Sequence, residues 1–213
     1  MIRVLGIDPG LTRCGVGVVD VSATRKATLV EVIVIRTPSD MPLEQRLLHV
    51  GDEIERMLDV HAPAAVAIER VFAQHNLSTV MSIAQISGVA LHLAAKRGLV
   101  VGLHTPSEVK AAITGYGSAD KKQVATMVAR VLGLAELPKP ADASDALAIA
   151  ITHAWRAGAM GDASRRRDAS ADEAVPRRLN MNAPASELTP AQQAWLAAER
   201  SAAKSVPKRR LGT

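Results

Sequence analysis

Acidic residues stand at the borders of apolar segments in this chain, where carboxylates are unusual. Asp8 and Glu69 each end an apolar run, and Asp142 and Asp145 open another. A carboxylate at the edge of a core is costly unless a cation meets it. The shared position of these four acids therefore points to a single metal site. The alternative is that Asp8 serves a turn while Asp142 and Asp145 cap a helix.

The spacing of the two later acids predicts how they would bind an ion. Asp142 and Asp145 are three residues apart, so on a helix they share one face. They also fall in the first turn, where the helix dipole favours negative charge. Oxygen ligands suit hard divalent cations, and Mg²⁺ is the usual one. Two such ions about 4 Å apart would activate water and stabilise a leaving oxygen, which is phosphodiester hydrolysis with the acids as ligands.

The apolar periodicity predicts an α/β domain that could bring these acids together. We expect strands at 2–8, 14–21, 28–36, 64–69 and 99–104, and helices at 42–60, 77–97, from about 106, from 118 or 120, and at 141–157. The strands at 14–21 and 28–36 are joined by a short connection and should pair antiparallel, whereas the fourth and fifth strands return across helices and should run parallel to their neighbours. The result is a mixed five-stranded sheet with helices on both faces. If the first and fourth strands are parallel neighbours, Asp8 and Glu69 emerge at the same edge.

The helix expected at 77–97 is apolar on more than one side. One side can cover the sheet, and the other needs a partner. A second copy of the chain is the simplest candidate. A third layer within the same chain is the alternative.

Composition places the chemistry in an N-terminal domain and the excess charge in an extension. The single cysteine, Cys14, indicates a reducing compartment, and we expect a cytoplasmic protein with no signal peptide and no membrane span. We expect a domain over 1–157 and a basic extension over 158–213, with a linker at 158–189 and a short helix at 190–204. The extension carries a net charge of +4 out of +5, which suits either a polyanionic partner or a solvated tail.

The chain's one phenylalanine, Phe72, lies in a polar stretch three residues after Glu69. An exposed ring beside a metal site could insert between nucleic-acid bases. The alternative is a buried loop anchor.

The chain resembles the RuvC family of crossover junction endodeoxyribonucleases, the bacterial Holliday-junction resolvases. The matching segments occur in the family's order: Gly6-Ile7-Asp8-Pro9-Gly10, Ala67-Ile68-Glu69-Arg70-Val71-Phe72, Val109-Lys110, Gly115–Lys121 and Ala141–Ala150. The resemblance covers about residues 1–157 and does not include the extension. It implies an RNase H-like fold and Mg²⁺ at Asp8, Glu69, Asp142 and Asp145, with Mn²⁺ as a substitute.

The same resemblance implies a substrate and partners. Family members act as homodimers in which each subunit nicks one strand of a four-way DNA junction, and they work with the RuvA and RuvB branch-migration proteins. They favour short thymine-containing sites. It also implies DNA-binding roles for the aromatic Phe72 and for Lys110 and Lys121. From position alone, Lys122 and Arg70 are further candidates for DNA contact.

Other functions remain open from the residues alone. An actin-like or sugar-kinase-like ATPase also begins with a strand that runs into an Asp-Gly turn, but it needs a second domain. A related nuclease could act on RNA. A catalytically silent DNA-binding scaffold is the third alternative, and the four intact acids argue against it.

Overall fold

The computed structural model describes residues 1–70 and 77–167, and Met1–Arg167 form one compact unit. The elements follow the expected order, and most begin and end within two residues of the expected bounds. They are β1 (Ile2–Asp8), β2 (Arg13–Val21), β3 (Ala27–Arg36), α1 (Leu43–His61), β4 (Ala65–Glu69), α2 (Leu77–Lys96), β5 (Val100–His104), α3 (Pro106–Thr114), α4 (Lys121–Leu132) and α5 (Ala141–Arg167).

The strands form one mixed sheet in the order β3-β2-β1-β4-β5. β1 pairs antiparallel with β2, and β2 pairs antiparallel with β3. β4 runs parallel to both β1 and β5. The central position of β1 beside β4 confirms the expected sheet and sends the carboxyl ends of these two strands to the same edge.

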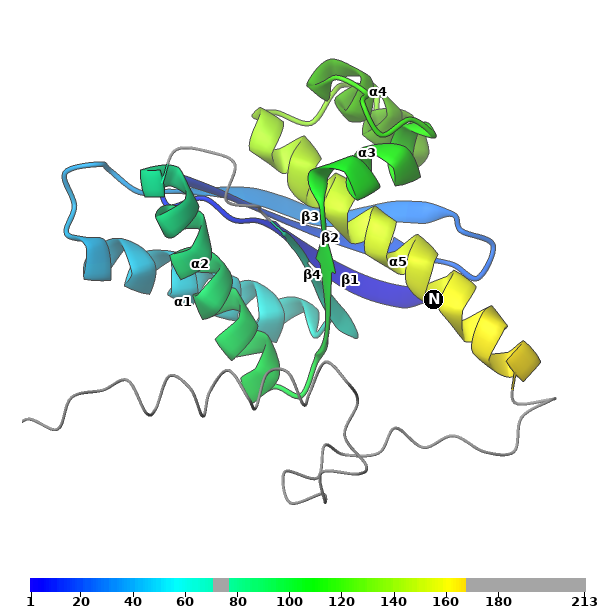
Figure 1. Cartoon of the computed structure of the whole chain (residues 1–213), viewed down its shortest axis with the longest axis horizontal. Helices are drawn as coiled ribbons and strands as arrows, with labels where there is room; N and C mark the ends of the chain where they lie inside the picture. The colour runs from blue at the N-terminus through cyan, green and yellow to red at the C-terminus, as the bar shows by residue number, and fades with distance from the viewer. Residues whose placement is uncertain (71–76, 168–213) are drawn as a thin grey trace, which may run out of the picture. The chain divides into compact units, whose positions relative to one another are not determined.

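Helices cover both faces of the sheet (Figure 1). On one face, α1 and α2 contribute Val50, Ile54 and Ile86 to a core that also contains residues of β1, β2 and β4. On the other face, α5 lies along β1 and β2 and contributes Leu147 and Ile151 to a second core, which α3 and α4 also join. The sheet is therefore buried between two apolar layers, as its continuous Val and Ile runs predict.

Glycines let α5 approach the sheet closely enough to place its first turn at the strand ends. A β-carbon at Gly15 of β2 would collide with the carbonyl oxygen of Asp142. A β-carbon at Gly6 of β1 would collide with the carbonyl oxygen of Ala146. Any side chain at these two positions would push the helix away from the sheet.

Side-chain caps fix the starts of the two short helices above α5. Thr105 caps α3 and forms a reciprocal pair with Glu108. Asp120, rather than Ser118, caps α4 and forms the same kind of pair with Gln123. The starts of the helices that carry Lys110 and Lys121 are thus fixed by local hydrogen bonds.

The last helix is longer than expected. α5 ends at Arg167, whereas the sequence suggested an end near residue 157. Gly158 and Gly161 suggested a linker, but a glycine within a helix costs only about 1 kcal/mol and keeps its hydrogen bond. The chain has no proline between Pro140 and Pro176 that would break the helix.

The boundary between the domain and the basic extension stays a prediction, and the helix expected at 190–204 lies outside the described residues. None of the helices within the described residues is both long and apolar enough to cross a membrane.

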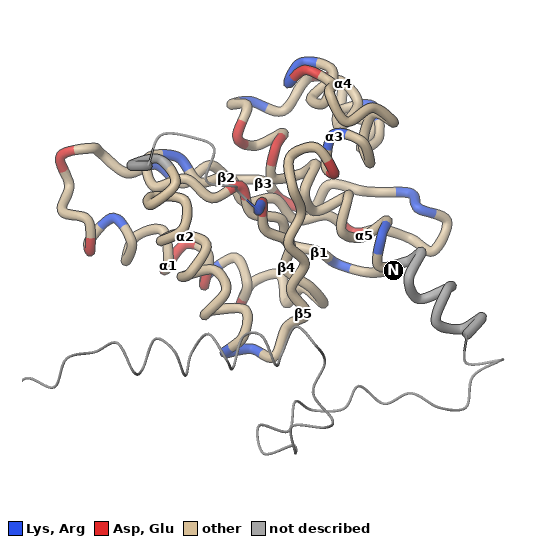
Figure 2. The backbone as a smooth tube through the Cα atoms, viewed as in Figure 1, with Lys and Arg blue, Asp and Glu red and all other residues tan. Residues whose placement is uncertain are grey.

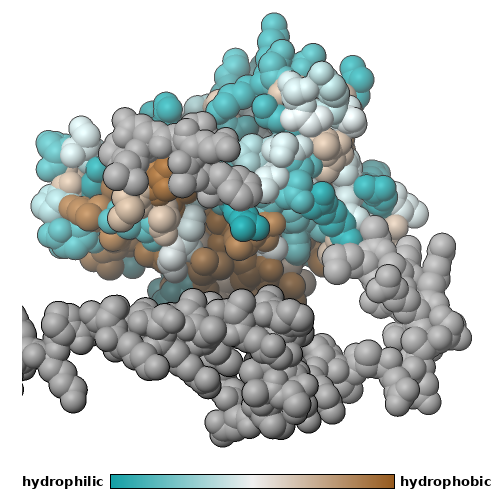
Figure 3. All heavy atoms as spheres, in the orientation of Figure 1, coloured by the Kyte–Doolittle hydropathy of each residue, from teal (hydrophilic) through white to brown (hydrophobic). Residues whose placement is uncertain are grey.

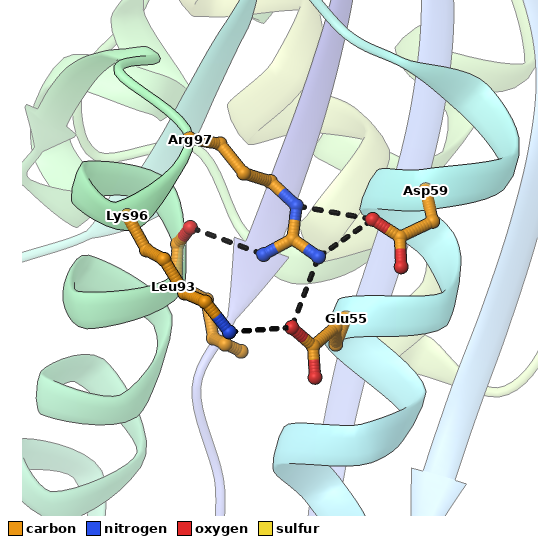
Figure 4. A network of polar contacts seen from close by, with 5 residues as sticks. All are labelled: Glu55, Asp59, Leu93, Lys96 and Arg97. Carbon is orange, nitrogen blue, oxygen red and sulfur yellow. Dashed lines mark hydrogen bonds and ion pairs between the residues drawn. The ribbon is translucent and has the colours of Figure 1, made fainter.

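A cluster of charged side chains fastens the end of α2 to α1 (Figure 4). The guanidinium of Arg97 donates to Asp59 at 2.6 Å and to Glu55 at 3.0 Å, and Lys96 contacts Glu55 at 3.4 Å. The Arg97 side chain is 22% exposed, whereas those of Asp59 and Lys96 are 61% and 62% exposed, so the network lies at the surface. It links the end of α2 to α1 in addition to the apolar contacts between the two helices.

Candidate active site

Two of the predicted acids lie next to each other at the ends of adjacent strands. Ile7 of β1 is paired with Ile68 of β4. Asp8 and Glu69 are the next residues of these two parallel strands, so they lie side by side at the strand ends. The charge of Glu69 acts on the Asp8 carboxyl and raises its pKa, so the two groups are close. The rigid strands therefore bring together two acids that are 61 positions apart in the sequence.

The start of α5 brings the other two acids to the same edge, with Asp142 in its first turn and Asp145 one turn later. Ser144 donates to the Pro138 carbonyl at 3.0 Å and anchors the start of the helix. Asp145 lines a pocket of about 460 Å³ together with Asp8 and Glu69. Asp142 is not part of this lining, but its charge acts on Asp8. The structure thus gathers three of the predicted acids around one pocket and places the fourth beside them.

Burial and mutual repulsion keep these carboxylates from ionising together. Burial, followed by the charges of Glu69, Asp145 and Asp142, raises the pKa of Asp8 to about 8. Burial and the charge of Asp145 raise the pKa of Glu69. Burial also raises the pKa of Asp145, although Lys121 opposes the shift. In the ion-free protein a proton on Asp8 relieves part of this repulsion at neutral pH.

Cations face the acids from three directions. Lys110 of α3 lines the pocket, and Lys121 of α4 contacts Asp145 Oδ2 at 3.5 Å. The charge of Asp145 raises the pKa of Lys121. Arg13 of β2 contacts Asp142 Oδ2 at 3.3 Å. In Figure 2, acidic and basic segments come together where the sheet meets α3 and α4.

The remaining predicted DNA contacts are not among the residues that line the pocket. Lys122 is exposed and lies next to Lys121, outside the pocket lining. Arg70 is exposed, and its backbone N–H donates to the His104 carbonyl at 2.7 Å. Phe72 lies outside the described residues.

Sequence reasoning missed Arg13, although it contacts one of the predicted ligands. The residue is the first of β2, two positions before Gly15, which pairs with Asp8 across the sheet. Residues two apart on a strand face the same side. The antiparallel pairing of β1 with β2, which was not predicted, therefore places Arg13 beside the acids.

The similarity of this chain to known proteins distinguishes among the families that its residues allow. The family model described as "Crossover junction endodeoxyribonuclease RuvC" matches residues 4–153. The crossover junction endodeoxyribonuclease RuvC of Leifsonia xyli subsp. xyli is 70% identical over 98% of both chains. That of Clavibacter michiganensis subsp. michiganensis is 64% identical over 94% of this chain and 98% of the relative.

Solved structures agree with the sequence match. RuvC of T. thermophilus in complex with a Holliday junction substrate has a TM-score of 0.72 and 38% identity, covering 76% of this chain and 97% of that one. The yeast mitochondrial Holliday junction resolvase Ydc2 has a TM-score of 0.56 and 14% identity over 78% of this chain and 86% of that one, which shows a shared RNase H-like fold alone. Family model, relatives and fold agree, and the chain belongs to the RuvC family of crossover junction endodeoxyribonucleases.

Proposed function

We propose that this protein is a structure-selective DNA endonuclease that resolves four-way junctions by paired, Mg²⁺-dependent nicks in recombination and repair. The observation that carries the proposal is the pocket at the ends of β1 and β4, where Asp8, Glu69 and Asp145 face Lys110 and Lys121. Acids that bind divalent ions beside lysines that bind phosphate are the parts that phosphodiester hydrolysis requires. Membership of the RuvC family supports the same substrate.

The donor set of the pocket fits a divalent cation. Its acidic side chains offer only oxygen, which suits Mg²⁺ or Mn²⁺ better than zinc. Burial, followed by the charges of Glu69, Asp145 and Asp142, raises the pKa of Asp8, and a bound cation would favour the ionised carboxylate. Within the described residues no three donors form a ready-made metal site. We propose two ions per site that keep several water ligands, as Mg²⁺ commonly does.

Each part of the pocket has a separate task in the proposed reaction. Two bound ions would supply an activated water and stabilise the leaving oxygen. Asp8 and Glu69 hold their oxygens on strand ends that cannot move independently of the core. Asp145 presents its carboxylate from near the start of α5. Lys121 and Lys110 bind the phosphate backbone from α4 and α3, and offset the charge that builds up on phosphorus.

The exposed side of α2 supports a homodimer. Ile86 and Ala90 are buried against the sheet, as expected for one side of this helix. The other side leaves Met81 54% and Leu91 38% exposed, and Leu103 of neighbouring β5 is 48% exposed. Figure 3 shows apolar surface gathered in this region. We propose that a second copy covers it, so that two sites can cut two strands of one junction.

The other partners and the location follow from family membership alone. We propose that the protein works with the RuvA and RuvB proteins in the cytoplasm, and that Phe72 inserts between bases at the junction. The buried, unpaired thiol of Cys14 is compatible with a reducing compartment.

A nicking assay tests the proposed function. Wild-type protein is incubated with a synthetic four-way junction, the matching duplex, an RNA–DNA hybrid or ATP, each with and without Mg²⁺. We expect symmetric nicks in the junction only, and only with Mg²⁺. Cleavage of the hybrid would indicate an RNA nuclease, and ATP hydrolysis would indicate an ATPase. Junction binding without any cleavage would indicate a scaffold. Each of these results would contradict the proposal.

A further inference from the structure

Arg13 of β2 is a cation at the acid cluster that has no role in the reaction proposed above. The side chain of Arg13 contacts Asp142 Oδ2 through its Nε at 3.3 Å. Lys121 contacts Asp145 in the same way from α4. Each of the two acids near the start of α5 thus contacts one cation, and the two cations come from different layers of the fold.

The backbone of Arg13 is firmly held. A β-carbon at Gly10 would collide with the Arg13 carbonyl oxygen, so the turn before β2 is tight. Arg46 of α1 donates to Thr12 Oγ1 at 2.9 Å and to Thr37 Oγ1 at 2.8 Å. These bonds join the start of β2 to α1 and to the residue after β3. The backbone of Arg13 therefore has a fixed position, and only its side chain is free to move.

The guanidinium itself is much less constrained. The Arg13 side chain is 59% exposed, whereas that of Asp142 is 19% exposed. An ion pair of this exposure is weak and depends on salt. A divalent cation bound beside Asp142 would compete with Arg13 for the carboxylate and repel the guanidinium. The freed group would remain at the rim of the site, with donors arranged to match a phosphate.

We infer that Arg13 is a positioning residue that exchanges partners, from Asp142 in the ion-free protein to a backbone phosphate of the DNA once divalent ions are bound. The inference rests on the proposed function, because it assigns Arg13 to the ions and phosphates of that same site. It gives the site a phosphate contact on the β2 side in addition to the lysines of α3 and α4. It also makes Arg13 a brake on ion binding in the absence of DNA.

The test compares full-length wild type with Arg13→Gln, with Arg13→Lys as a charge-preserving variant. Arg130→Gln is the matched control, since it removes one exposed positive charge from the last turn of α4. Mn²⁺ affinity is measured without DNA by calorimetry. Junction affinity is measured in Ca²⁺ as a function of salt concentration. Thermal melting checks that each variant is folded, and neither binding measurement depends on cleavage.

Two results are expected together. Arg13→Gln should bind Mn²⁺ about two- to five-fold more tightly, the range that the loss of one exposed ion pair allows. It should also bind the junction more weakly, with the slope of log affinity against log salt reduced by about 1. Arg13→Lys should restore most of that slope, and Arg130→Gln should leave Mn²⁺ affinity unchanged.

Unchanged Mn²⁺ affinity in Arg13→Gln would overturn the exchange at Asp142, and an unchanged salt slope would overturn the phosphate contact. Equal changes in Arg130→Gln would show a general charge effect and would also overturn the inference. Failure of the proposed function looks different, because the wild type itself would then neither bind Mn²⁺ at the acids nor cut junctions.

Discussion

Neutralising Asp8 should stabilise the ion-free protein while it abolishes cleavage. Its pKa is raised to about 8, from 3.8 in an unperturbed carboxyl, chiefly by burial and by Glu69. At pH 7 the folded protein keeps a proton on Asp8, whereas the unfolded chain has released it. The free energy of unfolding therefore falls by about 1.4 kcal/mol for each pH unit between the ordinary pKa of the carboxyl and pH 7. Over about three units, the loss is about 4 kcal/mol. Asp8→Asn removes this cost and keeps a donor toward Glu69.

We expect Asp8→Asn to raise the free energy of unfolding by about 2–4 kcal/mol at pH 7. The value can be lower than the full amount of about 4 kcal/mol because protonation of the neighbouring acids relieves part of the repulsion in the wild type. For a domain of this size the melting temperature should rise by at least about 4 °C. The wild type should lose stability as the pH rises from about 4 to 8, since the folded state binds the extra proton throughout that window. The variant should lack this slope.

The assay is chemical or thermal unfolding in the presence of EDTA between pH 5 and 8, repeated with Mg²⁺. Mg²⁺ should stabilise the wild type and leave Asp8→Asn nearly unchanged. Asp20→Asn is the matched control, because Arg3 donates to Asp20 at 2.7 Å and lowers its pKa. That control should be destabilised. The reasoning is refuted if Asp8→Asn is no more stable than wild type in EDTA, or if it keeps the same pH slope.

Three further predictions concern other parts of the molecule. Asp145→Asn should lower the cleavage rate by at least about 10²-fold yet keep junction affinity within a few-fold, measured by gel shift in Ca²⁺; intact cleavage would exclude Asp145 as a ligand. Leu91→Glu should shift the protein from dimer to monomer in sedimentation at micromolar concentration, whereas Lys122→Glu should not; a monomeric wild type would contradict the dimer. Thr105→Ala should lower stability by about 1 kcal/mol through loss of the α3 cap, measured by urea unfolding; an unchanged midpoint would contradict that role.

The meeting of the strand-end acids could be predicted only in part. The runs before Asp8 and Glu69 read as buried strands that each end on an acid, and this is a local pattern. Whether the two strands are neighbours depends on the order of the whole sheet, because β2, β3 and α1 lie between them in the chain. The helix spacing of Asp142 and Asp145 required no tertiary information.

Other features needed the three-dimensional structure. The contact between Arg13 and Asp142 depends on the close approach of α5 to β2. Gly15 allows this approach, but a glycine in the sequence does not by itself predict it. The end of α5 at Arg167 was missed because glycines weaken a helix without forbidding it. The pKa of Asp8 depends on the combined burial and charge of residues from three separate segments.

An anomalous difference map from crystals grown with Mn²⁺ and a junction strand would test the central claim most directly. The account predicts Mn²⁺ in the pocket at the ends of β1 and β4, with carboxylate oxygens of Asp8, Glu69 and an acid of α5 as ligands. Mn²⁺ bound only elsewhere, in protein that still cuts junctions, would contradict it.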